Sequence, residues 1–521
     1  MLKKMTSNDS MMTLAENKEQ TGYLWVFVSM PMWAKLFLLV IIALIPRIIV
    51  FLQPQIIPLD GTLYVQMAKL FSEGKYEGIP RNYFTLYPML IWAVQKLTTD
   101  WELSGQLISI TFGTLTVIPI FLLGRSLYNE KVGWLSALFY ITLPNFLKFD
   151  IQALRDPGSW FFIATTLWLV WEGLKKNRLI LLAYASISAG LGAITRVDGF
   201  IVWGTLVLYT AFQKVSKLCL KRRMLNIAIL TLLFPILLSP IFFSMKGFSE
   251  KTALGEMVSF SVRVITSNTR VILKPQEPID AMGRKTYDSL PQISQNSLEL
   301  ASRLRIGVAI SEVIHKFIKS ANLLIVLILP GFWKRKREGF QSSDWYLLYV
   351  FCALFIMSGF YARQIYYFST RHGLTLVIPT LFFGGHGLDF IAEGFSRGLN
   401  RLTSRWSFLK KYLLHLLTIF FILIFLAQGI AFKGTGKFVQ KEIGLWLKEK
   451  GYQGPVIMGP KNSFVWPSIG TENSKKCLIL GRRLWKPLNE TGLKSSLLIP
   501  APSIKITRAS SKTGPRQVFF R

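Results

Sequence analysis

Long apolar runs dominate this sequence and restrict what it can fold into. Eleven of them approach the length of about 20 residues that a helix needs to cross the hydrocarbon core of a bilayer. Apolar residues make up 51% of the 521-residue chain, charged residues only 17% and aromatic residues 14%, which excludes disorder for most of it. We therefore predict a polytopic membrane protein that is all-α in the membrane. The predicted spans are 35–53, 103–123, 133–149, 158–174, 179–195, 197–213, 225–245, 318–333, 345–361, 373–393 and 412–432.

Basic residues mark one side of these spans. Because cytoplasmic loops of membrane proteins carry an excess of Lys and Arg, this pattern predicts a multi-pass protein of the cytoplasmic (plasma) membrane with its N-terminus inside and its C-terminus outside. The topology accounts for most of the net charge of +33, and no nucleic-acid-recognition motif is present, so nucleic acid is not expected as a partner. The basic connections are Arg125–Lys131, Lys175–Arg178, Lys214–Arg223, Lys334–Arg337 and Arg397–Lys411.

The same pattern divides the chain into regions. Two outer loops of the membrane domain are long, 54–102 and 246–317. The regions are a cytoplasmic N-terminus with an interfacial segment (1–34), the membrane domain (35–432), a small extracytoplasmic α/β appendage (433–470) and a basic tail expected to be poorly ordered (471–521).

Ionisable residues are rare inside the spans and gather at their outer ends. Since charge is costly within a membrane, this placement predicts a site at the outer surface rather than an ion path at the midplane. The candidate site residues are Asp60, Tyr64 and Arg81 in the first outer loop, Asp156 in the second, Arg196 and Asp198 in the third, and Arg363, Arg371 and His372 in the fifth.

Ordinary structural roles are open for each candidate. Asp60 stands before an amphipathic pattern and Asp156 before a proline, so both suit helix N-caps. Arg196 and Asp198 can pair with each other across a tight reversal. The two arginines and His372 of the fifth outer loop suit a phosphate with an apolar tail, or else an aromatic belt that touches lipid headgroups.

No cofactor motif stands out. The four histidines include no pair at ligand spacing, the three cysteines form no pair, and no P-loop or dinucleotide fingerprint is visible. Metal binding stays open, because Asp60 and Asp156 would suit a divalent cation if they faced one another.

Several short fragments, taken together, resemble the GT-C glycosyltransferases, and most closely the branch with the protein O-mannosyltransferases and lipid A aminoarabinose transferases. The likeness covers roughly 35–215 well and 345–470 more loosely. Gly61 departs from the Asp-Glu pair of the protein-mannosyltransferase branch, which leaves the acceptor class open. The fragments are Arg47, Asp60 with Tyr64, Leu86-Tyr87-Pro88, Leu122–Tyr128, Asp156, Thr195–Gly199 and Arg371–Leu374 leading to Pro379.

The resemblance implies an inverting glycosyltransferase that moves a sugar from a polyprenyl-phosphate carrier to a hydroxyl of a protein, lipid or glycan outside the membrane. Asp60 would be the general base, Asp156 the second acid, and Arg196 or Arg371 would lie near the donor phosphate. A transporter or lipid flippase is the main alternative, because it would share the spans and composition, although no internal repeat is visible. A non-catalytic membrane scaffold is a further alternative.

Overall fold

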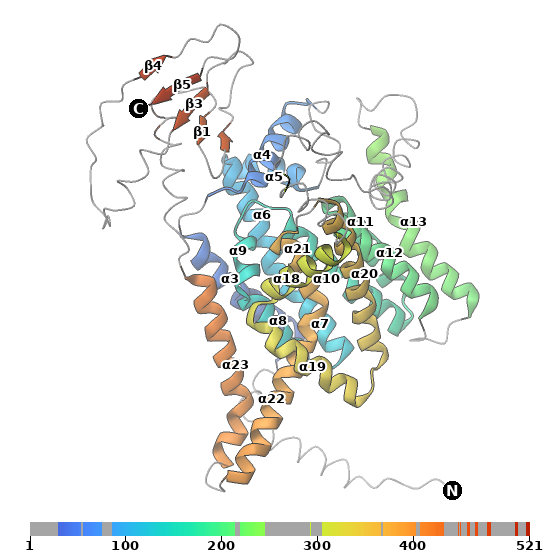
Figure 1. Cartoon of the computed structure of the whole chain (residues 1–521). Coiled ribbons are helices and arrows are strands. Elements are labelled where there is room, and N and C mark those ends of the chain that lie inside the picture. The colour runs from blue at the N-terminus through green and yellow to red at the C-terminus, as the bar shows by residue number, and fades with distance from the viewer. Residues whose placement is uncertain are drawn as a thin grey trace, which may run out of the picture. The chain divides into compact units, whose positions relative to one another are not determined.

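The computed structural model describes seven stretches, 30–53, 56–75, 86–213, 219–244, 305–365, 368–402 and 407–431, together with Gln292, Trp446, Glu449 and five strands near the C-terminus. The chain divides into two compact units, 1–432 and 433–521. The first unit holds the helices and the second holds the strands (Figure 1).

The helices follow the predicted apolar runs. Each of the eleven runs coincides with one helix or with consecutive helices, which confirms the all-α prediction for the membrane domain. In chain order the elements are α3 (Met32–Phe51), α4 (Leu59–Ser72), α5 (Leu86–Thr98), α6 (Trp101–Leu115), α7 (Val117–Leu127), α8 (Glu130–Thr142), α9 (Pro144–Asp150), α10 (Asp156–Lys176), α11 (Leu179–Thr195), α12 (Val197–Phe212), α13 (Leu220–Ser244), α18 (Arg305–Ala321), η3 (Asn322–Leu324), α19 (Ile325–Glu338), α20 (Ser342–Ile365), α21 (Thr370–Val377), η4 (Ile378–Thr380), α22 (Leu381–Leu402) and α23 (Ser407–Ile430).

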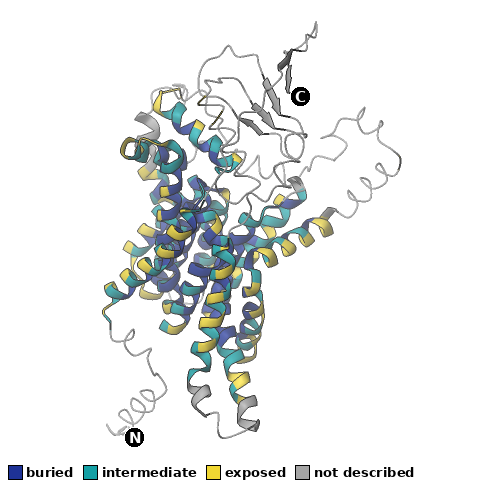
Figure 2. Cartoon of the chain, turned by 90° about the vertical axis from the view of Figure 1, so that its left-hand side faces the viewer, coloured by how far each residue is buried: buried dark blue, intermediate teal, exposed yellow. Residues whose placement is uncertain are grey.

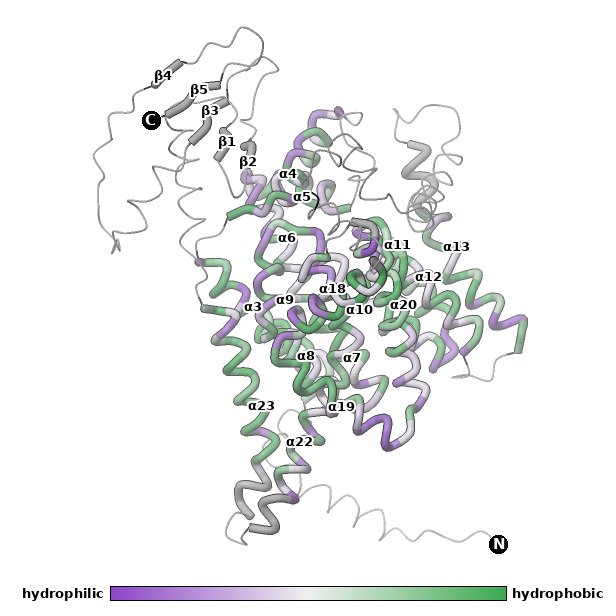
Figure 3. The backbone as a smooth tube through the Cα atoms, in the orientation of Figure 1, coloured by the Kyte–Doolittle hydropathy of each residue, from purple (hydrophilic) through white to green (hydrophobic). Residues whose placement is uncertain are grey.

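Six helical segments of the described chain are long and apolar enough to cross a membrane, and α11 and α12 are apolar but shorter. Hydrophobic residues run along the length of these helices in Figure 3. The chain is therefore a multi-pass membrane protein, and the orientation of its termini stays a prediction. The six segments are Met32–Phe51, Trp101–Leu127, Ile306–Glu338, Ser342–Arg363, Thr370–Arg397 and Tyr412–Ile430.

Helix α10 lies at the centre of the bundle. It packs against α6, α7, α11 and α12, and its Trp160 is fully buried. Figure 2 shows buried residues along the inside of the bundle and exposed ones on the outward helix faces. Close packing elsewhere depends on small residues, because a Cβ atom on Gly331 or Gly387 would lie 1.8 Å from a carbonyl oxygen of the neighbouring helix.

Two short helices, α4 and α5, occupy the predicted first outer loop and pack against each other and against α6. Helix α4 begins at Leu59, so Asp60 lies within its first turn, and the N-cap Pro58 has no side chain that could cap. Helix α10 begins at Asp156 itself, after Arg155, again without a side-chain cap. The N-cap interpretation is therefore wrong for both aspartates, and their carboxylates are available for other partners.

The second unit contains one five-stranded sheet. Its order is β2-β1-β3-β5-β4, with parallel pairs in the middle and an antiparallel strand at each edge. Strands β1 and β2 lie within the predicted α/β appendage (433–470). Three strands of the sheet lie beyond residue 470, so the sheet includes parts of both the predicted appendage and the predicted tail. The rest of the tail is outside the described residues. The strands are β1 (Val456–Met458), β2 (Phe464–Trp466), β3 (Cys477–Leu480), β4 (Ile506–Arg508) and β5 (Gln517–Phe520).

Candidate functional site at the outer helix ends

Asp60 and Arg371 form an ion pair between α4 and α21, although 311 positions separate them in the chain. Arg371 donates from Nη2 to Oδ2 of Asp60, and the two side chains are 23% and 33% exposed. Only one carboxylate oxygen of Asp60 is used in this bond. The other, Oδ1, accepts no hydrogen bond from the described residues, and because Asp60 is partly exposed a ligand can reach it.

A second group of charges joins α10 to the reversal between α11 and α12. Arg196 donates from Nε and Nη2 to Oδ2 of Asp198, at 2.9 and 2.8 Å, and from Nη1 to Oδ1 of Asp156. The predicted pairing of Arg196 with Asp198 is confirmed, and Asp156 is an additional partner. Asp156 is 1% exposed and Arg196 is 8% exposed, so this arrangement is enclosed by protein.

Arg155, the residue before Asp156, packs its guanidinium against the ring of Tyr64. Its guanidinium carbon is 5.5 Å from the centre of the Tyr64 ring, which in turn packs edge-on against Tyr87 at 5.4 Å. The preceding segment is held to α6, because Ser109 donates to the carbonyl of Leu154 at 2.8 Å and the Tyr87 hydroxyl bonds to Ser109 at 2.9 Å. Arg155 was not among the predicted site residues, although its place directly before Asp156 was a usable signal.

The six residues Asp60, Arg155, Asp156, Arg196, Asp198 and Arg371, here called the outer cluster, influence one another electrostatically. Burial alone would raise the pKa of Asp156, but Arg196 and Arg371 outweigh it and hold that pKa below its ordinary value. Burial raises the pKa of Tyr64 to about 12, so this hydroxyl stays neutral at physiological pH. Asp156 is therefore negatively charged among arginines at physiological pH.

The position after Asp60 has no room for a side chain, and glycine occupies it as Gly61. A Cβ atom at Gly61 would lie 2.7 Å from the carbonyl oxygen of Ala153 and 2.8 Å from a side-chain carbon of Ile57. Helix α4 thus contacts the backbone of the second outer connection directly. A glutamate here would require a backbone displacement, so the departure from the mannosyltransferase pattern has a steric cause.

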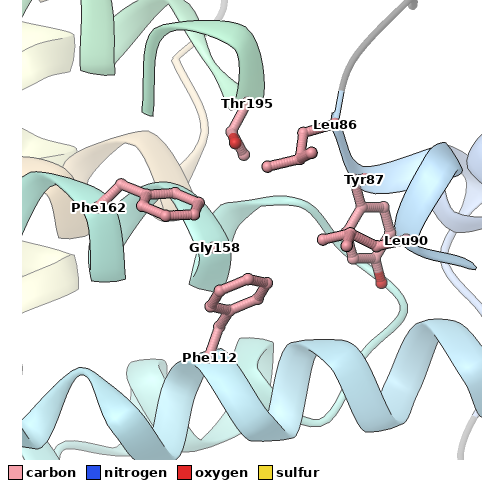
Figure 4. A pocket seen from close by; sticks show the side chains of 7 residues that line it. All are labelled: Leu86, Tyr87, Leu90, Phe112, Gly158, Phe162 and Thr195. Atoms are coloured by element: carbon pink, nitrogen blue, oxygen red, sulfur yellow. The ribbon is translucent and has the colours of Figure 1, made fainter. Parts of the chain in front are cut away.

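A small apolar hollow is lined by residues of α5, α6, α10 and α11 (Figure 4). It leaves no room for a water molecule, so it is closed to a sugar in this state. Two of its lining residues are close in sequence to the cluster, since Gly158 lies two positions after Asp156 and Thr195 directly precedes Arg196. Its lining residues are Leu86, Tyr87, Leu90, Phe112, Gly158, Phe162 and Thr195.

The remaining predicted residues have different outcomes. His372 packs edge-on against Tyr361, with ring centres 5.2 Å apart, and its buried Nδ1 has no hydrogen-bond partner. Arg363 is half-buried near the end of α20, and its relation to the cluster stays a prediction. Arg81 lies outside the described residues, as does the greater part of the loop 246–317.

The donor set of the outer cluster does not fit a metal ion. Asp60 is engaged by Arg371, and Asp156 by Arg196, so each carboxylate already has a cation as its partner. No group of three or more His, Cys, Asp or Glu side chains in the described part of the chain could hold a metal.

A separate arginine–aspartate pair lies deeper in the bundle. Arg47 of α3 donates from Nε and Nη2 to Oδ2 of Asp150 at 2.9 and 2.6 Å, and both side chains are 0% exposed. The guanidinium also lies 5.3 Å from the ring centre of Tyr140. Sequence analysis identified Arg47 but not its partner.

Comparisons with known proteins agree with this fold. A model of the dolichyl-phosphate-mannose-protein mannosyltransferase family matches 85–242, which includes Asp156 and Arg196 but neither Asp60 nor Arg371. No curated protein matches the chain in sequence.

Among solved structures, the chain is similar to the oligosaccharyltransferase of Archaeoglobus fulgidus. The form in complex with Zn and sulfate is 14% identical, with 85% of this chain and 59% of that chain covered and a TM-score of 0.50. The form tethered with an acceptor peptide containing the NVT sequon is 12% identical, with 88% and 62% covered and a TM-score of 0.51. ArnT from Cupriavidus metallidurans bound to undecaprenyl phosphate is 12% identical, with 83% of each chain covered and a TM-score of 0.49.

These likenesses show the fold, and the predicted resemblance to the GT-C glycosyltransferases is confirmed at that level. The chain spans about three-fifths of the length of the oligosaccharyltransferases that it matches. The outer cluster thus lies at the predicted outer end of a bundle with the GT-C arrangement.

Proposed function

We propose that this protein is an inverting glycosyltransferase that moves a sugar from a polyprenyl-phosphate carrier to a hydroxyl acceptor at the outer face of the membrane. The observation that carries the proposal is the convergence of Asp60, Asp156 and three arginines, from four separate segments of the chain, at one end of an apolar bundle. Aspartates and arginines in this arrangement suit an acid–base step beside a phosphate.

Asp60 is the general base in this proposal. The acceptor hydroxyl gives its proton to the free Oδ1 of Asp60, and the acceptor oxygen attacks the anomeric carbon of the donor sugar. The bond between that carbon and the phosphate oxygen breaks, and its electron pair stays on the phosphate. The products are the glycosylated acceptor, with inverted configuration, and the free polyprenyl phosphate. A positioned base of this kind contributes roughly 10²–10⁴-fold in rate.

The arginines stabilise the leaving group. The phosphate gains negative charge as the sugar departs, and cations fixed in a water-poor site lower the energy of that state without having to reorganise. Asp156 is too deeply buried to reach an acceptor, so it acts through Arg196 and Arg371, whose charges it holds in place. The carrier already stores the energy for transfer, which agrees with the lack of a nucleotide motif.

Sugar transfer in membranes tests the proposal. Membranes containing the full chain are incubated with a panel of labelled polyprenyl-phosphate sugars, and the label and anomeric configuration of the product are determined. We expect transfer with inversion, strongly reduced by Asp60→Asn and unchanged by Glu73→Gln, which alters an exposed carboxylate directly after the same helix. Movement of the carrier lipid across the bilayer without transfer from any donor would contradict the proposal and favour a transporter.

A further inference from the structure

The three arginines of the outer cluster differ in how far their nitrogens are occupied. Arg196 uses all three on carboxylates, since Nε and Nη2 bond to Asp198 and Nη1 bonds to Asp156. A guanidinium has five N–H groups in a rigid planar fork, so an arginine held from both sides cannot turn towards another anion without breaking these bonds. Arg196 has two negative partners and is the most enclosed of the three.

Arg155 is the opposite case. Among the described residues its side chain forms no ion pair and no hydrogen bond, and its buried Nε lacks any partner. Only the face of the guanidinium is used, where it lies on the ring of Tyr64. Because a buried donor without an acceptor carries a desolvation cost, an anion that reached Arg155 would recover that cost on binding.

Arg371 is intermediate. Its Nη2 bonds to Asp60, but its Nε is buried without a partner. The cluster contains three arginines and three aspartates, yet two of the aspartates form their ion pairs with Arg196. The positive charge that is not compensated by a bonded carboxylate is therefore concentrated at Arg155.

The position of Arg155 is linked to that of the base. Asp60 and Tyr64 are four residues apart on α4, so they lie on one face of that helix. Tyr64 supports the guanidinium of Arg155, while Asp60 is bonded to Arg371. One helix turn thus fixes the base beside both arginines that have an unpartnered Nε.

From these contacts we propose that Arg155, together with the free Nε of Arg371, binds the phosphate of the lipid-linked donor, whereas Arg196 is a positioning residue that holds Asp156. This inference rests on the proposed function, because it assumes a polyprenyl-phosphate substrate. The sequence-based expectation placed Arg196 or Arg371 near the donor phosphate and did not include Arg155, so the inference keeps Arg371 and departs from that expectation at Arg196.

Binding of undecaprenyl phosphate to the purified full chain in detergent tests this assignment. We expect Arg155→Gln to weaken binding about 10- to 100-fold, the range for losing a hydrogen bond to a charged group. Arg155→Lys keeps the charge and should recover part of the affinity. Lys148→Gln removes one exposed cation from the neighbouring helix α9 and should leave the affinity within twofold.

Further ligands identify the chemical group that Arg155 recognises. Undecaprenol lacks the phosphate, so its binding should not change in Arg155→Gln. Inorganic phosphate and phosphatidic acid are the competing sources of the same chemistry. If either binds through Arg155 while undecaprenyl phosphate does not, the site is an anion or headgroup site and the inference is wrong.

Steady-state transfer separates the roles of the two arginines. Arg155→Gln should raise the donor KM, whereas Arg196→Gln or Arg196→Lys should lower kcat more than tenfold with the donor KM within threefold. If Arg155→Gln binds undecaprenyl phosphate like the wild type while Arg196→Lys loses it, the assignment is overturned and the proposed function stands. If the wild-type protein does not bind undecaprenyl phosphate at all, the proposed function fails, and the inference fails with it.

Discussion

Two arginine–aspartate pairs in this protein consist of the same groups in different surroundings. Arg47 and Asp150 lie inside the bundle, both 0% exposed, and the guanidinium packs against an aromatic ring. Asp60 and Arg371 lie at the outer helix ends, 33% and 23% exposed. Each member of the outer pair retains a free polar atom.

The difference shows what each pair can do. A charge pair sealed inside protein cannot be reached by a substrate, and its partners depend on each other because either charge alone would be buried without compensation. A half-exposed pair contributes little to stability, since water screens it. We therefore interpret Arg47–Asp150 as a link between α3 and α9, and Asp60–Arg371 as a functional pair.

The largest expected effect follows from breaking the inner pair. Arg47→Met leaves Asp150 buried and unpaired, which should reduce the free energy of unfolding by about 3–5 kcal/mol. Thermal unfolding of the purified protein in detergent measures this. The double variant Arg47→Met/Asp150→Leu should recover most of the loss, because an apolar replacement of a buried pair is often neutral. A double variant as unstable as the single one would show that the pair does more than neutralise its own charges.

A smaller effect is expected where α4 contacts the second outer connection. The extra methyl group of Gly61→Ala would lie 2.7 Å from the carbonyl oxygen of Ala153, so the helix that carries Asp60 must move away. Overpacking of this kind costs about 1–3 kcal/mol, and here it should also lower sugar transfer. Gly74→Ala on the same outer segment is the control for backbone conformation. A Cβ atom there meets nothing within 4 Å, but Gly74 has a φ of 69°, which favours glycine. A loss of transfer in Gly61→Ala alone is therefore due to the contact with Ala153. Full transfer activity in Gly61→Ala would contradict the close contact.

The smallest effect is a dependence on pH. Asp156 has a pKa below its ordinary value because arginines outweigh its burial, so its contribution to stability persists down to acidic pH and is lost as the pH falls through that lowered pKa. Without Arg196, burial should raise the pKa of Asp156. Asp156 would then take up a proton at mildly acidic pH, which removes the buried unpaired charge and stabilises the variant. The difference in Tm between wild type and Arg196→Gln should narrow from pH 7 to pH 5. A constant or widening difference would mean that Arg196 does not set the ionisation of Asp156.

Much of the membrane domain was predictable, because the length and apolarity of a span are local properties. The positions of all eleven runs and the pairing of Arg196 with Asp198 were read from neighbouring residues. The N-cap interpretations of Asp60 and Asp156 were wrong because both aspartates lie inside the first turn of a helix, from which their side chains reach distant arginines.

Contacts over long distances in the sequence could not be predicted. Asp60 meets Arg371 across 311 positions, and Arg47 meets Asp150 across 103, and no local pattern encodes either pair. Arg155 was missed for another reason. Its place before Asp156 marks it in the sequence, but the sequence does not show that Asp156 pairs with Arg196 and leaves Arg155 without an acidic partner among the described residues.

The most direct test of Asp60 as the base measures stability and transfer together in Asp60→Asn. This nearly isosteric change removes the base but keeps the shape of the outer pair. We expect the Tm to stay within a few degrees of the wild-type value, because a half-exposed pair adds only about 0–1 kcal/mol, while sugar transfer falls roughly 10²–10⁴-fold. Transfer at the wild-type rate, or a loss of stability as large as that of Arg47→Met, would show that Asp60 is a structural residue and not the base.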